Sequence, residues 1–316
     1  MIQIFLTIDN NFAKYASTAI ASLIDHSNKE NNYIINIIYE DLTIENEDRL
    51  KSLETANCKI KCIKMDDVLN ELDDSYSHKL RADIFTLTIY FRIFLPRMFP
   101  EYDKGIYIDS DVILNDDIAN LYNIDLEDNL IGAIKDESVS DVEVLANYIE
   151  NAVGIDRYSY INSGVLLLNM KKLREVKFAE HFLYLLKKYN FDTIAPDQDY
   201  INAMCKGNIK FIDYKWDTMP IEGVEEKKSP SLVHYNLFYK PWHYKDVQYA
   251  KYYWKYADNS LFKDEIYAEL ETFNDEERAK DNNCFNLMAE RATKIIKDEI
   301  TFKKLFESKK EKRILW

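Results

Sequence analysis

Two carboxylates follow an apolar segment of the chain in a spacing that suits a metal ion. Asp109 and Asp111 are separated by one residue at the end of the run 105–108. In an extended strand, residues two positions apart point to the same side, so both side chains can face one cation. Two like charges this close are costly unless a positive group lies between them. Because hard oxygen ligands suit Mg²⁺ or Mn²⁺, the pair predicts a divalent-cation site.

A histidine at the end of a later apolar segment could complete this site. His234 follows the run 231–233, and Lys240 lies six residues further on. An imidazole beside two carboxylates shifts the metal preference from Mg²⁺ toward Mn²⁺, and a lysine suits a phosphate group. The ordinary alternatives are an aspartate-rich turn, a structural histidine and a solvated lysine.

The charge of the chain indicates why such a cation would be useful. The 316 residues include 41 Lys and Arg against 55 Asp and Glu, a formal net charge of -14. Such a surface repels the phosphate backbone of nucleic acids, so we expect no nucleic-acid partner. It also repels a small phosphate-bearing substrate, unless a cation or a local arginine reverses the charge at the binding site.

The first third of the chain predicts a parallel sheet. Five segments are expected in the order strand, helix, strand, helix, strand: 2–8, 10–26, 33–40, 43–56 and 58–65. Phe12 and Tyr15 fall on the apolar face of the first helix. This βαβαβ pattern is typical of an α/β fold with helices on both faces of the sheet. The first glycine is Gly105, which excludes a glycine-rich phosphate loop after the first strand.

The remaining segments continue this alternation and then become helical. The expected elements are a helix over 81–100 that Pro96 stops, strands over 105–111, 129–135 and from 160, a helix between Pro196 and Gly207, and strands over 209–216 and 231–237. Gly164 marks a point where the backbone is approached closely. From about residue 250 the chain is charged and helical.

Composition also bears on location. Four cysteines fit neither a disulfide framework nor a zinc pattern, so we expect reduced thiols and a cytoplasmic protein. No signal peptide is expected, and no run approaches the ~20 apolar residues of a membrane helix. The segment 301–316 has six Lys and Arg against two Glu, with interleaved apolar residues. It could lie on an anionic membrane at the inner face, or it could be a solvated final helix.

Six segments together resemble glycosyltransferase family 8, which includes bacterial lipooligosaccharide galactosyltransferases and glycogenin. In chain order they are LTIDNNFAKYA, TLTIYFRIFLP, YIDSDVIL, YINSGVLLLNMKKLR, PDQDYIN and VHYNLFYKPWH. The resemblance implies a GT-A fold, an α/β domain whose mixed, mostly parallel sheet is flanked by helices. It would occupy residues 1–250, followed by a helical C-terminal segment over 251–316.

The implied activity is retaining transfer of a hexose, glucose or galactose, from a UDP-sugar to a glycan, a lipid-linked glycan or another hydroxyl acceptor in bacterial cell-surface polysaccharide synthesis. Mn²⁺ is the implied cofactor, with Mg²⁺ possible. The resemblance assigns the metal to Asp109, Asp111 and His234. The donor-binding residues it implies are Thr7, Asp9 and Asn11 for uridine, Arg92 and Lys240 for the diphosphate, Asp136 and Asn162 for the sugar, and the neighbouring Ser110 and Ser163. Asp197 and Gln198 would lie beneath the anomeric carbon, positioning the donor for front-face attack.

Two other functions remain open from the residues alone. A haloacid-dehalogenase-type phosphohydrolase also carries D-x-D after an apolar strand, with Asp109 as its nucleophile. A nucleotide-sugar-binding protein without turnover would need the same metal residues. Two positions depart from the family pattern: Leu237 stands where many members have glycine close to the phosphates, and Asn10 follows Asp9 where some members have a second acidic residue.

Overall fold

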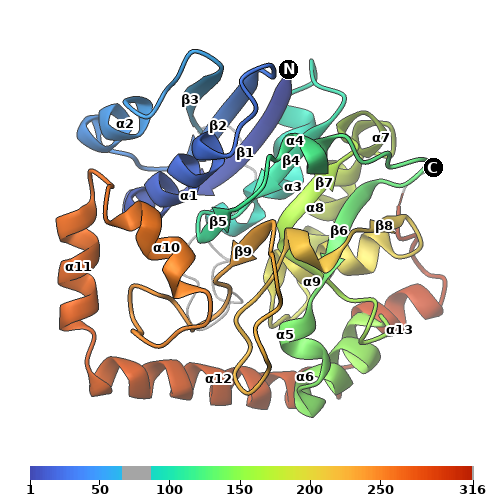
Figure 1. The fold of residues 1–316 in the computed structure, drawn as a ribbon. Helices are drawn as coiled ribbons and strands as arrows, with labels where there is room; N and C mark the ends of the chain where they lie inside the picture. The colour runs from blue at the N-terminus through green and yellow to red at the C-terminus, as the bar shows by residue number, and fades with distance from the viewer. Residues whose placement is uncertain (66–86, 315–316) are drawn as a thin grey trace.

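A seven-stranded sheet forms the centre of the molecule in the computed structural model, which describes residues 1–65 and 87–314 (Figure 1). Its strand order is β3-β2-β1-β4-β7-β6-β8. The strands of this sheet are β1 (Ile2–Ile8), β2 (Tyr33–Tyr39), β3 (Cys58–Lys64), β4 (Gly105–Ile108), β6 (Ile131–Lys135), β7 (Ile161–Leu168) and β8 (Ile209–Phe211). A separate two-stranded sheet pairs β5 (Val112–Leu114) with β9 (Leu232–His234).

Helices cover both faces of the sheet and continue beyond it. The α-helices of the described residues are α1 (Ala13–Asp25), α2 (Ile44–Lys51), α3 (Phe91–Met98), α4 (Ala119–Tyr122), α5 (Glu137–Ser140), α6 (Glu143–Tyr148), α7 (Met170–Glu175), α8 (Phe178–Tyr189), α9 (Pro196–Cys205), α10 (Ala250–Ala257), α11 (Lys263–Thr272), α12 (Asp275–Ile295) and α13 (Phe302–Glu307). Short 3₁₀ helices occupy η3 (Leu87–Tyr90) and η5 (Tyr214–Trp216), and a π-helical turn occupies η4 (Ile149–Val153).

The sheet is mixed and mostly parallel, as the sequence predicted. β3, β2, β1 and β4 run parallel, β7 is antiparallel to both β4 and β6, and β8 is parallel to β6. Ile4 pairs with both Ile35 and Ile106, so β1 lies inside the sheet. Strands buried on both faces need apolar residues at nearly every position, which explains the run IQIFLTI.

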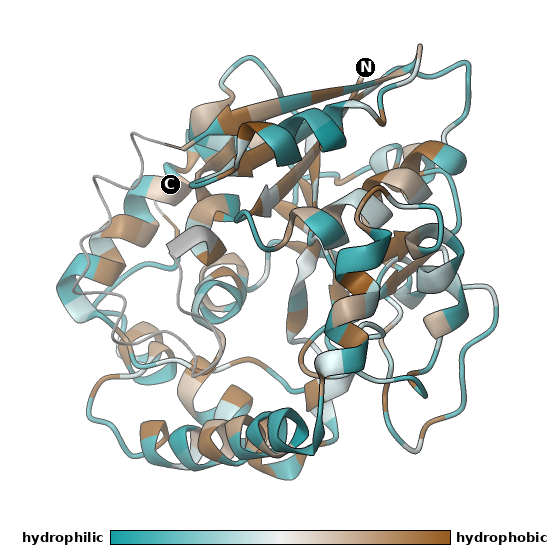
Figure 2. Cartoon of the chain, turned by 90° about the vertical axis from the view of Figure 1, so that its left-hand side faces the viewer, coloured by the Kyte–Doolittle hydropathy of each residue, from teal (hydrophilic) through white to brown (hydrophobic). Residues whose placement is uncertain are grey.

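Two hydrophobic cores lie on opposite faces of the sheet. Because side chains alternate along a strand, Phe5 belongs to one core, and Ile4 and Leu6 belong to the other. Figure 2 shows hydrophobic residues concentrated along the central strands, whereas the surrounding helices carry both hydrophobic and hydrophilic residues. The sheet therefore holds its strand ends at fixed positions between two packed layers of helices.

The C-terminal helices contribute to both cores. Tyr253 in α10 and Ile266 in α11 join the core that contains α1, whereas Met288 in α12 and Phe302 in α13 join the opposite one. In Figure 1, α11 and α12 run along the edge of the molecule and connect the two sides. The helical character predicted from about residue 250 is confirmed.

Several local predictions were wrong. Pro96 does not stop its helix: α3 continues to Met98, because the Phe99 N–H reaches the Leu95 carbonyl (3.0 Å) across the proline. Residues 81–86 of the predicted helix lie outside the described residues. The helix predicted over 43–56 ends at Lys51, and the late strands are only three residues long.

In residues 301–314, the described part of the basic C-terminal segment, the apolar side chains pack into the core. Its helix α13 is six residues long, and Phe302, Leu305, Phe306 and Ile314 are buried in the core. Exposed lysines remain on this segment, including Lys309 and Lys310. Of the helices that the structure describes, none combines the length and hydropathy needed to cross a bilayer. None of the four cysteines, all of which lie in described residues, forms a disulfide.

Substituting Phe302→Ala should destabilise the whole protein. The ring is 2% exposed and packs 4.0 Å from the Phe191 ring and 4.8 Å from the Tyr200 ring, measured between centroids. Loss of such a ring lowers the free energy of unfolding by about 3–5 kcal/mol, measurable by urea denaturation. Phe211→Ala is the control, because that ring is 45% exposed and should cost less than about 1 kcal/mol. Equal effects would show that α13 does not belong to the core.

Candidate functional site

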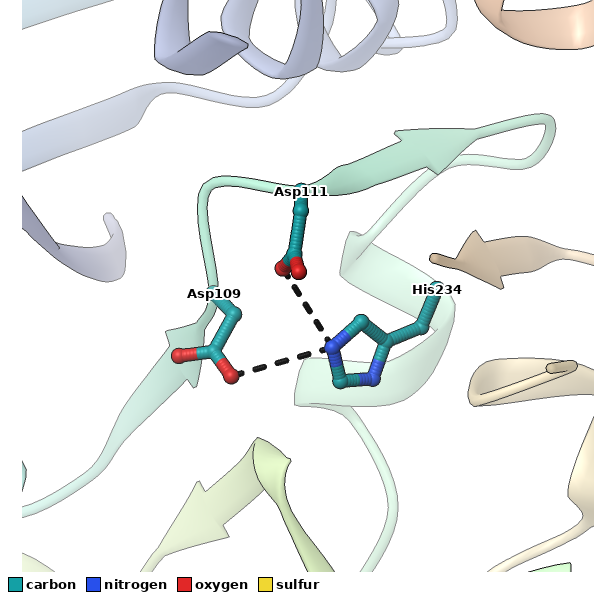
Figure 3. A group of neighbouring side chains, drawn as sticks. All are labelled: Asp109, Asp111 and His234. Atoms are coloured by element: carbon teal, nitrogen blue, oxygen red, sulfur yellow. Dashed lines mark ion pairs between the residues drawn. The ribbon is translucent and has the colours of Figure 1, made fainter. Parts of the chain in front are cut away.

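The pairing of β5 with β9 brings the predicted metal residues together. Asp109 and Asp111 flank the turn between β4 and β5, and His234 ends β9 opposite Val112. The His234 Nε2 atom lies 3.3 Å from Asp111 Oδ1 and 3.7 Å from Asp109 Oδ2 (Figure 3). The three possible ligand atoms all lie within 4.8 Å of one another. This convergence is what a divalent cation requires, so the cluster could bind a metal.

A further carboxylate holds the imidazole in position. Asp217 Oδ1 lies 2.9 Å from Nδ1 of His234, which leaves Nε2 directed at Asp109 and Asp111. Metal-ligating histidines usually have such a partner, because it fixes the ring and its tautomer. Asp217 was missed by the sequence reasoning, since it follows a 3₁₀ turn and no spacing relates it to His234. Its burial raises the pKa of its carboxyl to about 6.

Gly164 leaves the space that the cluster occupies. A Cβ atom at this position would lie 2.3 Å from Cε1 of His234 and 2.6 Å from Oδ2 of Asp109. Both distances are shorter than any ordinary contact, so no other residue fits without moving His234 or Asp109. The close approach predicted at Gly164 is therefore confirmed.

The charged side chains of the cluster shift one another's pKa values. Burial lowers the pKa of His234, but the attraction of Asp111 and Asp217 outweighs burial and raises it well above the ordinary value. Burial likewise raises the pKa of Asp111, whereas Lys240 and His234 lower it more, so the net shift is downward. A cation between the carboxylates would act in the same direction as these neighbours.

Lys240 lies beside the cluster at the end of a short turn. Its Nζ is 2.5 Å from Asp111 Oδ2 and also donates to the Tyr235 carbonyl. Leu237, in the same loop, has φ of 55°, a left-handed conformation that favours glycine. A leucine therefore holds a backbone conformation here that glycine would adopt without strain.

All the residues predicted to form a site line one cleft of about 550 Å³. They are Thr7, Asp9, Asn11, Arg92, Asp109, Ser110, Asp111, Asp136, Asn162, Ser163, Asp197, Gln198, His234 and Lys240. Thr7 near the end of β1, and Asp9 just after it, line the cleft because ligands bind where the parallel strands end at one edge of the sheet. The structure therefore brings the predicted residues to one location.

Arg92 is engaged by the protein rather than free. Its guanidinium contacts Asp109 Oδ1 (3.0 Å) and Asp197 Oδ2 (3.1 Å), and it donates to the Ser163 carbonyl (2.7 Å). It also lies over the Tyr107 ring, 4.3 Å from the centroid. This buried arginine links Asp109 to Asp197 of α9, so it orients two carboxylates of the cleft. A phosphate contact would need one of these bonds to open.

The amide of Gln198 is held from two sides. Its Oε1 accepts from the Ser163 N–H (3.0 Å), and its Nε2 donates to Asp136 Oδ2 (2.9 Å). Asn162 donates to the same Asp136 oxygen (3.2 Å). α9 begins with Pro196 at its first position, which places Asp197 and Gln198 in the first turn, facing the cleft.

Two cleft features were not predicted. Phe12 was expected on the apolar face of α1, but it precedes the helix, is 41% exposed and lines the cleft. The opposite end of the cleft is lined by aliphatic side chains, including Leu145, Ile149 and Met288. Their apolar character alone could not distinguish them from core residues.

Asp199 is excluded from the cleft although it shares a helix with Asp197. Its carboxylate is fully buried and accepts from the hydroxyls of Tyr148 and Tyr160, both at 2.7 Å. Burial outweighs these hydrogen bonds and raises the pKa of Asp199 from 3.8 to about 6.

The Asp199→Asn variant should change how the free energy of unfolding depends on pH, because it removes the buried carboxyl. A raised folded-state pKa stabilises the protein below pH 3.8, and that contribution is lost as pH rises through about 6. The unfolding free energy of the native chain should therefore fall relative to the variant by about 3 kcal/mol between pH 4 and 7. Urea denaturation across this range measures it, with the exposed Asp125→Asn as control. If the difference in unfolding free energy between the native chain and the variant were constant across this pH range, the raised pKa of the buried carboxyl would be contradicted.

Substituting Gly164→Ala should weaken divalent-metal binding while leaving the fold intact. The added methyl must displace His234 or Asp109, so affinity for Mn²⁺, titrated by electron paramagnetic resonance, should fall by about tenfold or more. Gly132→Ala is the matched control in another buried strand, where the methyl would meet Ile212 and Leu126 instead. Unchanged Mn²⁺ affinity in the Gly164 variant would show that the cluster does not hold the ion.

Comparisons with known proteins identify the family of this chain. A putative glycosyltransferase of Haemophilus influenzae is 28% identical over 253 residues, covering 77% of this chain and 74% of that protein. The lipopolysaccharide 1,2-glucosyltransferase of Escherichia coli K12 is 25% identical over 291 residues, covering 82% and 78%. The crystal structure of the galactosyltransferase LgtC with donor and acceptor sugar analogues superposes with a TM-score of 0.68 at 22% identity. It matches 88% of this chain and all of that one, and supports a GT-A fold. Because the model of glycosyl transferase family 8 also matches residues 3–246, this chain belongs to that family of enzymes.

Proposed function

We propose that this glycosyltransferase moves a hexose, glucose or galactose, from a UDP-sugar to a hydroxyl of a glycan or lipid-linked glycan, with retention of configuration. The observation that carries the proposal is the convergence of Asp109, Asp111 and His234 in a cleft that Asp197 and Gln198 also line. We assign residues 1–250 to the catalytic domain and 251–316 to a supporting helical segment.

The nucleotide would occupy the wall formed by the end of β1. Thr7, Asp9 and Asn11 offer polar groups to uridine, and the exposed ring of Phe12 offers a surface on which the base can stack. Ser110 lies between the two metal carboxylates, near the expected diphosphate. Lys240 lies at the same point and carries a positive charge suited to a phosphate.

Asp109, Asp111 and His234 would hold Mn²⁺, since mixed oxygen and imidazole ligands favour it over Mg²⁺. When bound, the ion supplies Lewis acidity that neutralises the charge of the departing diphosphate. Asp217 orients the imidazole, and Arg92 keeps Asp109 beside Asp197. These contacts organise the site before a substrate arrives, which favours catalysis by electrostatic preorganisation.

Retention of configuration needs either a nucleophile beneath the sugar or attack from the face that the leaving group occupies. Asp199 is too deeply buried and hydrogen-bonded to attack a sugar. The Gln198 amide is a weak nucleophile whose oxygen already accepts the Ser163 N–H. We therefore propose front-face attack, with Asp197 and Gln198 positioning the sugar, and with Asp136, Asn162 and Ser163 around its hydroxyls.

The relatives support a surface glycan as the acceptor. The Escherichia coli protein named above is a lipopolysaccharide glucosyltransferase, and this chain covers most of its length. The phosphohydrolase hypothesis is set aside, since the chain belongs to a glycosyltransferase family and His234 adjoins both carboxylates. A protein that binds UDP-sugars without turnover is the remaining alternative.

Removing a metal ligand should abolish Mn²⁺-dependent hydrolysis of UDP-glucose or UDP-galactose. Asp111→Asn or His234→Ala should lower the rate by about a hundredfold or more, because one ligand of the ion is lost. Released UDP, followed with a coupled assay in the presence and absence of MnCl₂, measures it. His26→Ala is the matched control, since this histidine lies at the end of α1 and outside the cleft.

Turnover that is equal with and without metal would reject the metal-dependent mechanism. UDP binding that requires Mn²⁺, without product from either donor and any glycan acceptor, would favour the binding protein instead.

A further inference from the structure

A carboxylate on a C-terminal helix connects two chain segments that flank the cleft. Glu269 is in α11, beyond residues 3–246 that the family model matches. One of its oxygens, Oε1, lies 2.8 Å from Nε2 of His243. The other, Oε2, accepts from the Tyr15 hydroxyl (2.5 Å) and lies 2.6 Å from Nζ of Lys14. The single side chain therefore connects α1 with the segment that contains His243.

His243 belongs to the same turn as Lys240. The Lys240 carbonyl accepts from the N–H groups of His243 (3.0 Å) and Tyr244 (2.9 Å), so residues 240–244 form one hydrogen-bonded unit. Lys240 extends from this unit to Asp111, whereas His243 extends from it to Glu269. A shift of His243 is consequently transmitted to Lys240 through only two residues.

Aromatic rings pack against residues 240–244 on two sides. The Trp242 ring stacks on Tyr15 with centroids 3.9 Å apart, and the His243 ring stacks on Phe273 at 4.2 Å. Tyr244 donates to Asp281 of α12 (2.7 Å). The turn thus lies between α1 and the corner where α11 meets α12. Glu269 of α11 bonds both to α1 and to the turn.

The residues that Glu269 contacts in α1 are close in the chain to residues that line the cleft. Lys14 and Tyr15 follow Asn11 and Phe12, which line the cleft at the expected nucleoside position. Glu269 therefore holds the N-terminal end of α1 and the Lys240 turn at a fixed separation. Its side chain is 25% exposed, and burial is outweighed by its bonds to His243, Lys14 and Tyr15, which lower its pKa to about 2.

We propose that Glu269 is a positioning residue for donor binding, which sets the distance between the nucleoside wall and the diphosphate turn through Tyr15 and His243. The inference rests on the proposed UDP-sugar site. It assigns the C-terminal helical segment a role in the affinity for the donor, in addition to its role in the core.

Isothermal titration of UDP in saturating MnCl₂ tests the proposal, at a temperature where circular dichroism shows each variant folded. Glu269→Ala should raise the Kd for UDP by about tenfold, since charge-assisted hydrogen bonds to two elements are lost. In the donor-hydrolysis assay, KM should rise by the same factor while kcat changes by less than about threefold, because the chemical step uses other residues.

Glu265→Ala is the matched control. Glu265 is on the same helix and forms an ion pair with Arg49 of α2 (2.7 Å), but it has no contact with the turn. This variant should lose some stability and keep the native Kd. A merely structural role for Glu269 would give the same result for both variants.

Two milder variants test the same connection if Glu269→Ala does not fold. Glu269→Gln removes the charge, and His243→Phe removes the bond to Glu269 while keeping a ring to stack on Phe273. Each should raise the Kd for UDP. Because both changes remove the same connection, the Kd of the double variant should not exceed the larger of the two single-variant Kd values. Native affinity in both single variants would overturn the inference. Failure of the unmodified protein to bind UDP with Mn²⁺ would overturn the proposed function and this inference with it.

Discussion

The structure depends on how it accommodates negative charge at one edge of its sheet. Asp109, Asp111, Asp136 and Asp197 all line one cleft, in a chain whose net charge is already -14. Like charges at these separations are tolerated only with positive partners between them. The chain provides Arg92 between Asp109 and Asp197, and His234 with Lys240 around Asp111. These four carboxylates have three positive side chains as partners, so the cleft remains acidic and has the ligand set for a further cation.

This constraint explains why the positive groups are so firmly held. Arg92 is buried, with its guanidinium bonded to two carboxylates and the Ser163 carbonyl. His234 is oriented by Asp217, and Gly164 leaves room for its ring. Fixed dipoles and charges need not reorganise when a substrate binds, which is the usual source of electrostatic catalysis. The same rigidity requires support from the layers around the sheet, and the C-terminal helices supply part of it.

Much of the fold and site was predictable from the residues themselves. The apolar runs predicted β1, β2 and β3, and Pro196 and Gly207 bounded α9, because these signals act within a few residues. The spacing of Asp109 and Asp111, read with His234, predicted the cluster that the structure brings together. Predictions were wrong where a local signal competes with packing: Pro96 lies inside α3, and Phe12 precedes α1 and lines the cleft.

The sequence by itself determined the chemistry available to this protein: its acidic charge, its metal-ligating residue types and the strands that carry them. The tertiary structure decided which of those residues meet. These contacts are Asp217 beside His234, Arg92 between two carboxylates, and Glu269 between α1 and the turn that contains His243. They join distant residues, such as Tyr15 and Glu269, which are 254 positions apart. No periodicity relates such positions, because their contact arises only when separately folded elements pack on a common sheet.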